Sequence, residues 1–344
     1  MNRPGRISVL VSVSVVCFGL AAGYLVWAKH SAAVGSVVEP TPGGSESTAQ
    51  LDLGAALAQP HVVFRNAQPG AGFGMVAVST LRAPDGPRAV GQQLCERTYA
   101  TAGGGVCLAP KRGLVPTYAL VSLNSRLQPV ASSPLVGLPS RTRMSRDSSL
   151  VSTTTFVGGH SYGDGKFSTE TIIRRDGVSL GNIENFTTTL PDGSKLTAVD
   201  RNFWGVTFAA DDDTFYATAA SGNTTWLVRG SLRAKTMTGL RTDAECPSLS
   251  PDGTKIAYKK RLGAKLGVWH LAVLDLKSGK ETVLAEQRSV DDQMEWLDAD
   301  HLLYQLPRDG AGSTSTDIWQ VPADGTGQPS VFIEDASSPA VVRP

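Results

Sequence analysis

Short runs of apolar or alternating residues, each bounded by turn-forming residues, recur along most of the chain. The clearest unit is 245–284, where this pattern predicts four strands, at 247–249, 255–260, 268–276 and 281–284. The third run is almost wholly apolar, which is typical of a strand covered on both faces. Between the first two runs, Ser250, Pro251 and Gly253 suit a type I turn. Four antiparallel strands in about 45 residues are what one blade of a β-propeller requires.

Five other stretches of the chain repeat this pattern. They cover 61–93, 95–134, 141–189, 198–237 and 291–335. The copy at 141–189 is longer, because a glycine-rich insertion separates its expected strands at 149–157 and 169–174. Repetition of a four-stranded unit at this spacing is typical of a β-propeller.

The first unit, 61–93, lacks an innermost strand, and the end of the chain supplies a candidate. Residues 335–342 resemble 243–249, the segment that leads into the clearest unit. If 339–343 pairs beside 62–65, the C-terminus closes the ring and no long sheet edge stays open. We therefore predict an all-β fold, a six-bladed β-propeller over 61–344 that is closed by the C-terminal strand.

The first sixty residues have a different pattern. Residues 1–6 are short and basic, and 7–28 contain no charged residue. As a helix rising ~1.5 Å per residue, 7–28 is long enough to cross a hydrocarbon core of ~30 Å. Residues 29–60 are rich in Pro, Gly, Ser and Thr, which predicts a flexible linker in which 51–57 could form one helical turn.

The apolar segment 7–28 decides the expected location. A cleaved signal peptide usually has an apolar region of only ~7–15 residues, so we favour a retained transmembrane anchor. The flanking charges modestly favour a cytoplasmic N-terminus and hence an extracytoplasmic propeller in a single-pass membrane protein. Secretion after cleavage of a signal peptide is the alternative.

Composition narrows the class of partner. The 344 residues include 32 Lys and Arg against 31 Asp and Glu, a net charge of +1. Binding to nucleic acid would call for a clustered basic face, so we expect no nucleic-acid partner. The 36 Gly and 20 Pro suit a chain of short strands and many turns.

Two turn-centred segments carry a resemblance to a known family. The run LSPDGTKIAY at 249–258 and, more weakly, LPDGSKL at 190–196 resemble the WD40-like repeats of TolB-like propellers from the bacterial cell envelope. The resemblance covers 62–343 and implies a six-bladed propeller with an envelope partner. TolB itself, for which the family is named, carries an α/β domain before its propeller, and 31–60 is too short to hold such a domain. Such motifs indicate a fold more than a function, because many unrelated activities use the same fold.

Two glycine-containing motifs resemble functional sites. Gly177, Ser179 and Gly181 match G-x-S-x-G, the nucleophile elbow of hydrolases. That elbow needs a strand before the serine and a helix after it, whereas in this chain a hairpin turn precedes Ser179 and further strand is expected at 182–186. The run at 70–74 has three glycines but no following βαβ unit, so we expect a loop and no phosphate site. We assign no catalytic or cofactor-binding residue.

Metal binding has little support in the sequence. The histidines show no i, i+4 pair and no spacing with cysteine that suits zinc. They are His30, His61, His160, His270 and His301. His270 lies in the apolar run 268–276 and is expected to be a core histidine. The acidic run 211–213 lacks the spaced ligands of a calcium loop, so we interpret it as an exposed turn.

The cysteines allow two disulfide pairings. Cys17 lies in the apolar segment 7–28, which leaves Cys95, Cys107 and Cys246 in the exported part. Cys95 would open the first strand of its blade and Cys107 would lie in the next strand, and paired strands bring Cα atoms to about 5 Å. We therefore expect a structural disulfide between Cys95 and Cys107, with Cys95–Cys246 as the alternative.

These observations together predict a non-catalytic module. We expect a membrane-anchored, extracytoplasmic propeller that binds an envelope protein or a cell-wall component, with no cofactor and no metal. The alternative is an enzyme, a lyase or hydrolase that degrades an envelope polymer in the propeller channel. Such an enzyme would need clustered acidic or basic side chains at the channel mouth, and the sequence alone does not place such a cluster.

Overall fold

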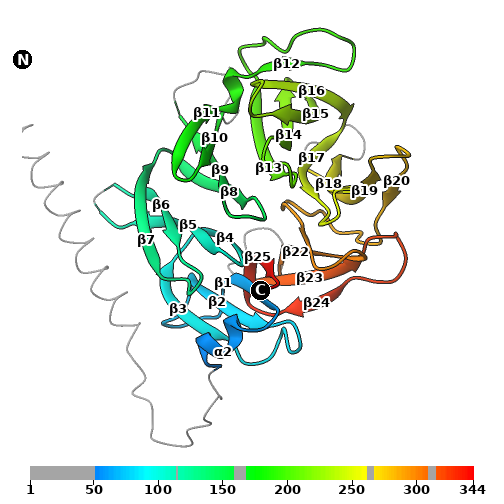
Figure 1. The fold of residues 1–344 in the computed structure, drawn as a ribbon. Coiled ribbons are helices and arrows are strands. Elements are labelled where there is room, and N and C mark those ends of the chain that lie inside the picture. Colours follow the sequence, from blue (N-terminus) through cyan, green and yellow to red (C-terminus); the bar gives the residue numbers. More distant parts are fainter. Residues whose placement is uncertain (1–50, 114, 159–167, 262–266, 309–314) are drawn as a thin grey trace, which may run out of the picture. The chain divides into compact units, whose positions relative to one another are not determined.

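The computed structural model describes residues 51–344, except 114, 159–167, 262–266 and 309–314, as six β-sheets arranged as the blades of a propeller (Figure 1). The innermost strands β25, β4, β8, β13, β17 and β21 contact one another in this order, and β21 contacts β25 again. This closed ring confirms the predicted six-bladed all-β fold.

Blades 1 to 3 have four strands each, in order from the innermost outward. Blade 1 contains β25 (Ala336–Val342), β1 (His61–Asn66), β2 (Met75–Thr80) and β3 (Ala89–Leu94). Blade 2 contains β4 (Arg97–Thr101), β5 (Gly104–Lys111), β6 (Thr117–Leu123) and β7 (Pro129–Leu135). Blade 3 contains β8 (Leu138–Met144), β9 (Leu150–Val157), β10 (Ser168–Arg175) and β11 (Val178–Asn182).

Blades 4 to 6 follow the same plan. Blade 4 contains β13 (Asn202–Phe208), β14 (Thr214–Ser221), β15 (Thr224–Ser231), β16 (Thr236–Thr242) and β12 (Thr187–Thr189). Blade 5 contains β17 (Ala244–Leu249), β18 (Lys255–Arg261), β19 (Trp269–Asp275) and β20 (Glu281–Val283). Blade 6 contains β21 (Glu295–Trp296), β22 (His301–Pro307), β23 (Thr316–Pro322) and β24 (Ser330–Ile333).

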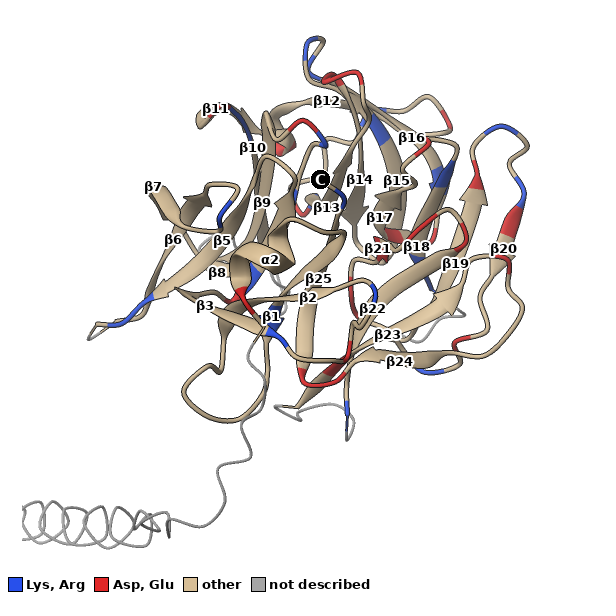
Figure 2. Cartoon of the chain, turned by 60° about the horizontal axis from the view of Figure 1, so that its bottom comes forward, with Lys and Arg blue, Asp and Glu red and all other residues tan. Residues whose placement is uncertain are grey.

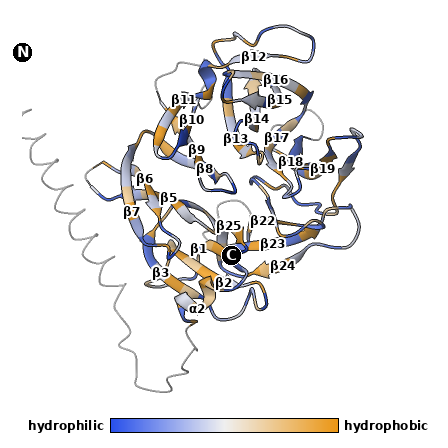
Figure 3. Cartoon of the chain, in the orientation of Figure 1, coloured by the Kyte–Doolittle hydropathy of each residue, from blue (hydrophilic) through white to orange (hydrophobic). Residues whose placement is uncertain are grey.

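The C-terminal strand β25 closes the ring, as the sequence predicted. It pairs antiparallel with β1 in a register that sets Val341 opposite Val62 and Val342 opposite His61. Val342 packs into the hydrophobic core between blades 1 and 2, whereas Val341 packs against the cluster shared with blade 6. Figure 3 shows hydrophobic residues along β1, β2 and β25. Full burial of a valine such as Val342, which is 3% exposed, contributes about 1.5–3 kcal/mol, so closure has a hydrophobic component.

The similarity between the segments before β17 and β25 extends to the backbone. Asp243 and Asp335 both adopt positive φ, at 57° and 48°. Cys246 and Ser338 do so as well, at 51° and 57°, and a proline follows each of them. Positive φ is uncommon outside glycine, so these two matched pairs indicate the same bulged conformation in both innermost strands.

The structure differs from the sequence-based expectations at three elements. Strand β12 adds a fifth, parallel strand to the outer edge of blade 4, beside β16. The expected strand over 182–186 is instead the 3₁₀ turn η1 (Ile183–Asn185). Strand β7 ends at Leu135, one residue beyond the expected unit 95–134, because its register with β6 continues to the Leu135–Tyr118 pair.

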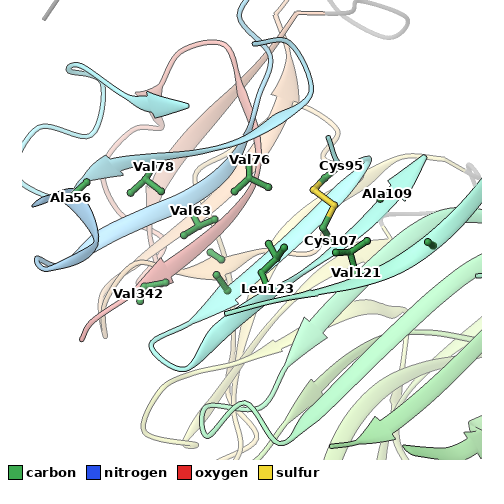
Figure 4. Packing of buried hydrophobic residues seen from close by; sticks show 13 residues of the cluster. Ala56, Val63, Val76, Val78, Cys95, Cys107, Ala109, Val121, Leu123 and Val342 are labelled. Atoms are coloured by element: carbon green, nitrogen blue, oxygen red, sulfur yellow. A yellow bond between two sulfur atoms is a disulfide. The ribbon is translucent and has the colours of Figure 1, made fainter. Parts of the chain in front are cut away.

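Helix α2 (Leu53–Leu57) lies within the stretch expected to be linker. The Asp52 carboxylate accepts a hydrogen bond from the Ala55 N–H at 2.8 Å and thereby caps the helix N-terminus. Ala56 is buried against blade 1, near Val78 (Figure 4). The short helical turn expected within 51–57 is therefore present, and it packs on blade 1. The helix in the described residues is not a membrane span, and the expected anchor at 7–28 lies outside them.

Candidate functional site

A large cavity opens where the innermost strands end. This wide cavity has a volume of about 870 Å³ and is lined by all six blades. The lining includes the ends of the innermost strands and the turns that follow them. One lining residue from each of blades 1 to 6, in that order, is Val342, Tyr99, Met144, Thr207, Leu249 and Trp296. The ring therefore brings together residues that lie far apart in the sequence.

The wide cavity carries charges of both signs and several aromatic rings. Its basic residues are Arg143, Arg146, Arg229 and Arg343, and its acidic residues are Asp211, Asp252, Glu295 and Asp298. Tyr99, Tyr216 and Trp296 add aromatic surface. Figure 2 likewise shows acidic and basic residues of the propeller interspersed. The lining suits a polar ligand with groups of both signs better than a ligand of uniform charge.

Three of the four carboxylates hold the turns at the cavity rim. Asp252 accepts a hydrogen bond from the Ser250 hydroxyl at 2.6 Å, and this bond lowers the pKa of the Asp252 carboxyl. Asp211 accepts from the Thr214 N–H and hydroxyl, each at 2.7 Å. Asp298 accepts from the backbone N–H of Asp300 at 2.8 Å. These bonds to ionised oxygens stabilise the turns between first and second strands.

The fourth carboxylate, Glu295, lies in the floor of the cavity. It forms an ion pair with Arg143, and their side chains are only 9% and 6% exposed. Arg143 also donates to the Met294 carbonyl at 2.6 Å, and its guanidinium lies 4.7 Å from the centre of the Tyr99 ring. Arg143 belongs to blade 3 and Glu295 to blade 6, which are opposite each other in a six-bladed ring. This ion pair therefore spans the channel.

Burial changes the acid–base properties of the floor. Removal from water disfavours the charged form of a carboxyl and raises the pKa of Glu295, although Arg143 opposes this change. Burial and then the charge of Glu295 raise the pKa of Tyr99 to about 12. The Tyr99 hydroxyl donates to both Glu295 oxygens at 3.3 Å. The buried Glu295 carboxyl is thus contacted by hydrogen-bond donors from both Tyr99 and Arg143.

Below the floor lies a second, narrow cavity of about 30 Å³. Its lining is Arg97, Thr98, Tyr99, Arg141, Thr142, Arg143, Asp292, Gln293, Ser338 and Pro339. It shares Tyr99 and Arg143 with the wide cavity, so the floor separates the two. The Gln293 side-chain amide donates to the Val206 and Pro247 carbonyls, at 3.0 and 2.8 Å, and thereby joins blade 6 to blades 4 and 5.

The motifs singled out in the sequence lie away from both cavities. Ser179 is exposed on β11, the outermost strand of blade 3, and its hydroxyl oxygen accepts from the Gly181 N–H at 3.1 Å. The 70–74 run forms the turn between β1 and β2 and lines a cavity of about 400 Å³ with residues of β3. Gly74 adopts a φ of +80°, and a Cβ there would lie 2.7 Å from the Leu94 side chain.

The cysteines and histidines have structural environments. A disulfide joins Cys95 to Cys107 with a Cα–Cα distance of 5.4 Å, and Cys246 is a free, buried thiol. Figure 4 shows the disulfide among the valines between blades 1 and 2. His270 is half-buried on β19. No group of three acidic, histidine or cysteine side chains that could hold a metal occurs among the residues that the structure describes.

The residues that meet in the channel were not singled out from the sequence. Arg97 and Tyr99 alternate on β4, as Arg141 and Arg143 do on β8, so each pair lies on one face of its strand. Charged residues at alternate positions of an expected innermost strand are the available signal. That signal indicates a polar channel wall, but it does not tell which side chains meet across the channel.

Comparisons with known proteins bear on the fold. No protein-family model and no curated protein matches the sequence. Among solved structures, TolB from Acinetobacter baumannii matches with a TM-score of 0.53 and 14% identity, over 83% of this chain and 67% of that one. TolB from Agrobacterium tumefaciens matches with a TM-score of 0.47 and 11% identity, over 79% and 87%.

A chain in the crystal structure of a nidogen/laminin complex is about as similar. Its TM-score is 0.51 at 8% identity, over 82% of this chain and 97% of that one. Identities this low show a shared fold and leave the activity open. The chain is thus a six-bladed β-propeller with structural similarity to the TolB propellers.

Proposed function

We propose that this protein is a non-catalytic binding module of the cell envelope, held to the membrane by residues 7–28. In this proposal the wide cavity receives a segment of an envelope protein or of a cell-wall polymer. The observation that carries the proposal is the cavity itself. Its volume of about 870 Å³ lies within the range of ~300–1,000 Å³ typical of ligand sites.

The state of the cavity's carboxylates supports binding over catalysis. A hydrolase or lyase needs an acidic group that is free to exchange a proton with its substrate. Asp211, Asp252 and Asp298 already accept hydrogen bonds from their own turns. The mixed charges and the aromatic rings offer hydrogen bonds and stacking to a peptide or a glycan.

Photo-crosslinking tests this proposal directly. A photoreactive amino acid at Arg146, an exposed residue that lines the wide cavity, should capture one protein or cell-wall fragment in near-stoichiometric amount in cells. The matched control is Val178, 69% exposed on the outermost strand of blade 3. Capture of the same species from both positions would contradict a cavity-specific partner.

The expected location is supported by the disulfide. Disulfides persist in oxidising compartments, so the Cys95–Cys107 disulfide supports a location outside the cytoplasm. If 7–28 is an anchor, the full-length protein should stay with membranes after a carbonate wash. Release of a shortened form that begins near Gly23 or Ser31 would instead support secretion after cleavage.

One observation favours an enzyme as the second candidate. Burial raises the pKa of Glu295, as expected for a carboxyl that stays protonated until it acts as a general acid. A lyase or hydrolase would then use Glu295 at the cavity floor. The test is turnover of purified cell-wall polymer by the protein and by Glu295→Gln, with unfolding measured to verify the fold. Turnover that this substitution abolishes in a folded variant would favour the enzyme and contradict the binding module.

A further inference from the structure

Arg97 is a cation without a partner in the narrow cavity. It is the first residue of β4, is half-buried, and lines the cavity together with Arg141. Within the described part of the chain, its guanidinium forms no hydrogen bond or ion pair, although a buried charge is normally paired. An unpaired, partly buried guanidinium that faces a cavity indicates a place for an anion.

Several other cations of the propeller, by contrast, are paired with carboxylates. Arg143 pairs with Glu295, as described above, and two further pairs lie nearby. These are Arg261–Glu245 at 3.0 Å and Lys259–Asp291 at 2.6 Å. Of the three arginines that line the narrow cavity, Arg97 is the one that contacts no carboxylate among the described residues.

Arg141 is the second donor available at the narrow cavity. Its Nη atoms donate to the carbonyl oxygens of Ser140 and Asp291, at 3.0 and 3.2 Å. Its contact with the Asp291 carboxylate is long, 3.5 Å, and its buried Nε–H has no partner among the described residues. Arg141 is thus only partly satisfied and retains the capacity to donate to a ligand.

Asp292 is the carboxylate with the largest electrostatic effect on Arg97. It lines the narrow cavity, but its Oδ2 accepts from the Gln305 N–H at 3.0 Å, and no ion pair joins it to Arg97 in the described residues. Burial and then Arg141 lower the pKa of Arg97 to about 10, against the opposing effect of Asp292 and Asp291. The local environment therefore disfavours the positive charge unless an anion enters.

We infer that the narrow cavity is a binding subsite for a carboxylate group, held by the guanidinium groups of Arg97 and Arg141. A guanidinium fork matches the two oxygens of a carboxylate, which is planar and carries one charge. The cavity, with a volume of about 30 Å³, restricts the site to a small group. This subsite lies on the other side of the floor from the wide cavity and does not depend on the proposed function.

The test compares anions at constant ionic strength. Urea unfolding of the full chain is measured with increasing acetate in place of chloride, for the wild type, Arg97→Gln and Arg126→Gln. Arg126 is an exposed arginine of the same blade and serves as the matched control. Acetate should raise the wild-type and Arg126→Gln midpoints. Arg97→Gln should need about tenfold to hundredfold more acetate for the same rise, because a hydrogen bond to a charged group is lost.

The substitution should not prevent folding, because the Arg97 side chain makes no hydrogen bond in the described structure. Without added acetate, Arg97→Gln should be at least as stable as the wild type, since it removes repulsion from Arg141. An acetate response that Arg97→Gln retains would overturn the subsite. Equal stabilisation of the wild type by chloride, acetate and phosphate would overturn its assignment to carboxylates.

A second arm distinguishes the source of the carboxylate. N-acetylglycine presents the carboxylate as a peptide C-terminus does, and its amide serves as the control. Tighter binding of N-acetylglycine than of acetate would identify a peptide terminus as the ligand. Equal binding of both, lost in Arg97→Gln, would identify a small free acid. Binding of the amide as strongly as the acid would contradict a carboxylate subsite.

Discussion

Charged side chains are compensated by different kinds of partner at the two ends of the channel. At the wide end, Asp211, Asp252 and Asp298 accept hydrogen bonds from the turns that carry them, so local sequence satisfies each carboxylate. At the narrow end, Arg97 lies at a strand start, where no side chain of its own turn reaches it. The floor, formed by Arg143 and Glu295, relies on a partner from the opposite blade. Charges that are satisfied locally suit a structural role, and the charge left unpaired indicates a ligand.

Breaking the ring should affect both ends at once and have the largest effect. Deletion of 338–344 removes most of β25, including the buried Val342, and leaves one edge of β1 largely unpaired. Loss of the buried Val342 alone costs about 1.5–3 kcal/mol, against a stability of ~5–15 kcal/mol typical of small domains. The urea midpoint of the full chain should therefore fall steeply.

The control for this deletion removes 343–344 alone, which lie beyond β25. It loses the bond from Arg343 to the Leu297 carbonyl and should lower the midpoint only slightly. An unchanged midpoint and slope for the longer deletion would show that β25 contributes nothing to closure.

Breaking the floor should have the next largest effect. Glu295→Gln leaves the guanidinium of Arg143 buried without its counter-charge, which should cost about 3–5 kcal/mol in the free energy of unfolding. The double variant Arg143→Met/Glu295→Gln should recover part of this loss, because no unpaired charge stays buried. Urea unfolding of the wild type, both single variants and the double variant measures the coupling. Additive losses would mean that the two side chains do not interact across the channel.

Acidification should weaken the wide end through the protonation of Asp252. The Ser250 hydroxyl and then the Thr254 N–H lower the pKa of Asp252 in the folded protein. A depressed pKa stabilises the fold above the unfolded pKa of ~3.9, and this contribution is lost as the pH falls through the folded value. Asp252→Asn should therefore show a smaller loss of stability between pH 5 and pH 2 than the wild type. Identical pH profiles in urea unfolding would contradict this role of Asp252.

Substitution of two serines should have the smallest effects on stability, and it compares a position at the channel with one at the outer edge of a blade. The buried Ser250 hydroxyl donates to Asp252 and accepts from the Lys255 N–H, so Ser250→Ala should cost about 1 kcal/mol. Ser179→Ala, on an exposed outermost strand, should change stability by less than about 0.5 kcal/mol. A fluorophosphonate probe should not label Ser179, and specific labelling would contradict its non-catalytic assignment.

The sequence by itself determined the repeating architecture. Strands β18 and β9 agree within a residue with the runs expected at 255–260 and 149–157. Ring closure was also predictable, because the likeness of 335–342 to 243–249 reflects the same bulged backbone. Strand alternation and turn chemistry depend on neighbours in the chain, so they can be seen in a single sequence.

Only the tertiary structure decided the candidate site. Arg143 and Glu295 are 152 positions apart and meet because blades 3 and 6 face each other across the ring. The parallel strand β12 and the packing of α2 on blade 1 likewise depend on surfaces that distant segments provide. Alternation indicates which face of a strand is polar, but the distance across the channel depends on how six twisted sheets pack together. That packing is a property of the whole ring, so neither the floor ion pair nor the unpaired Arg97 could be recognised from local sequence.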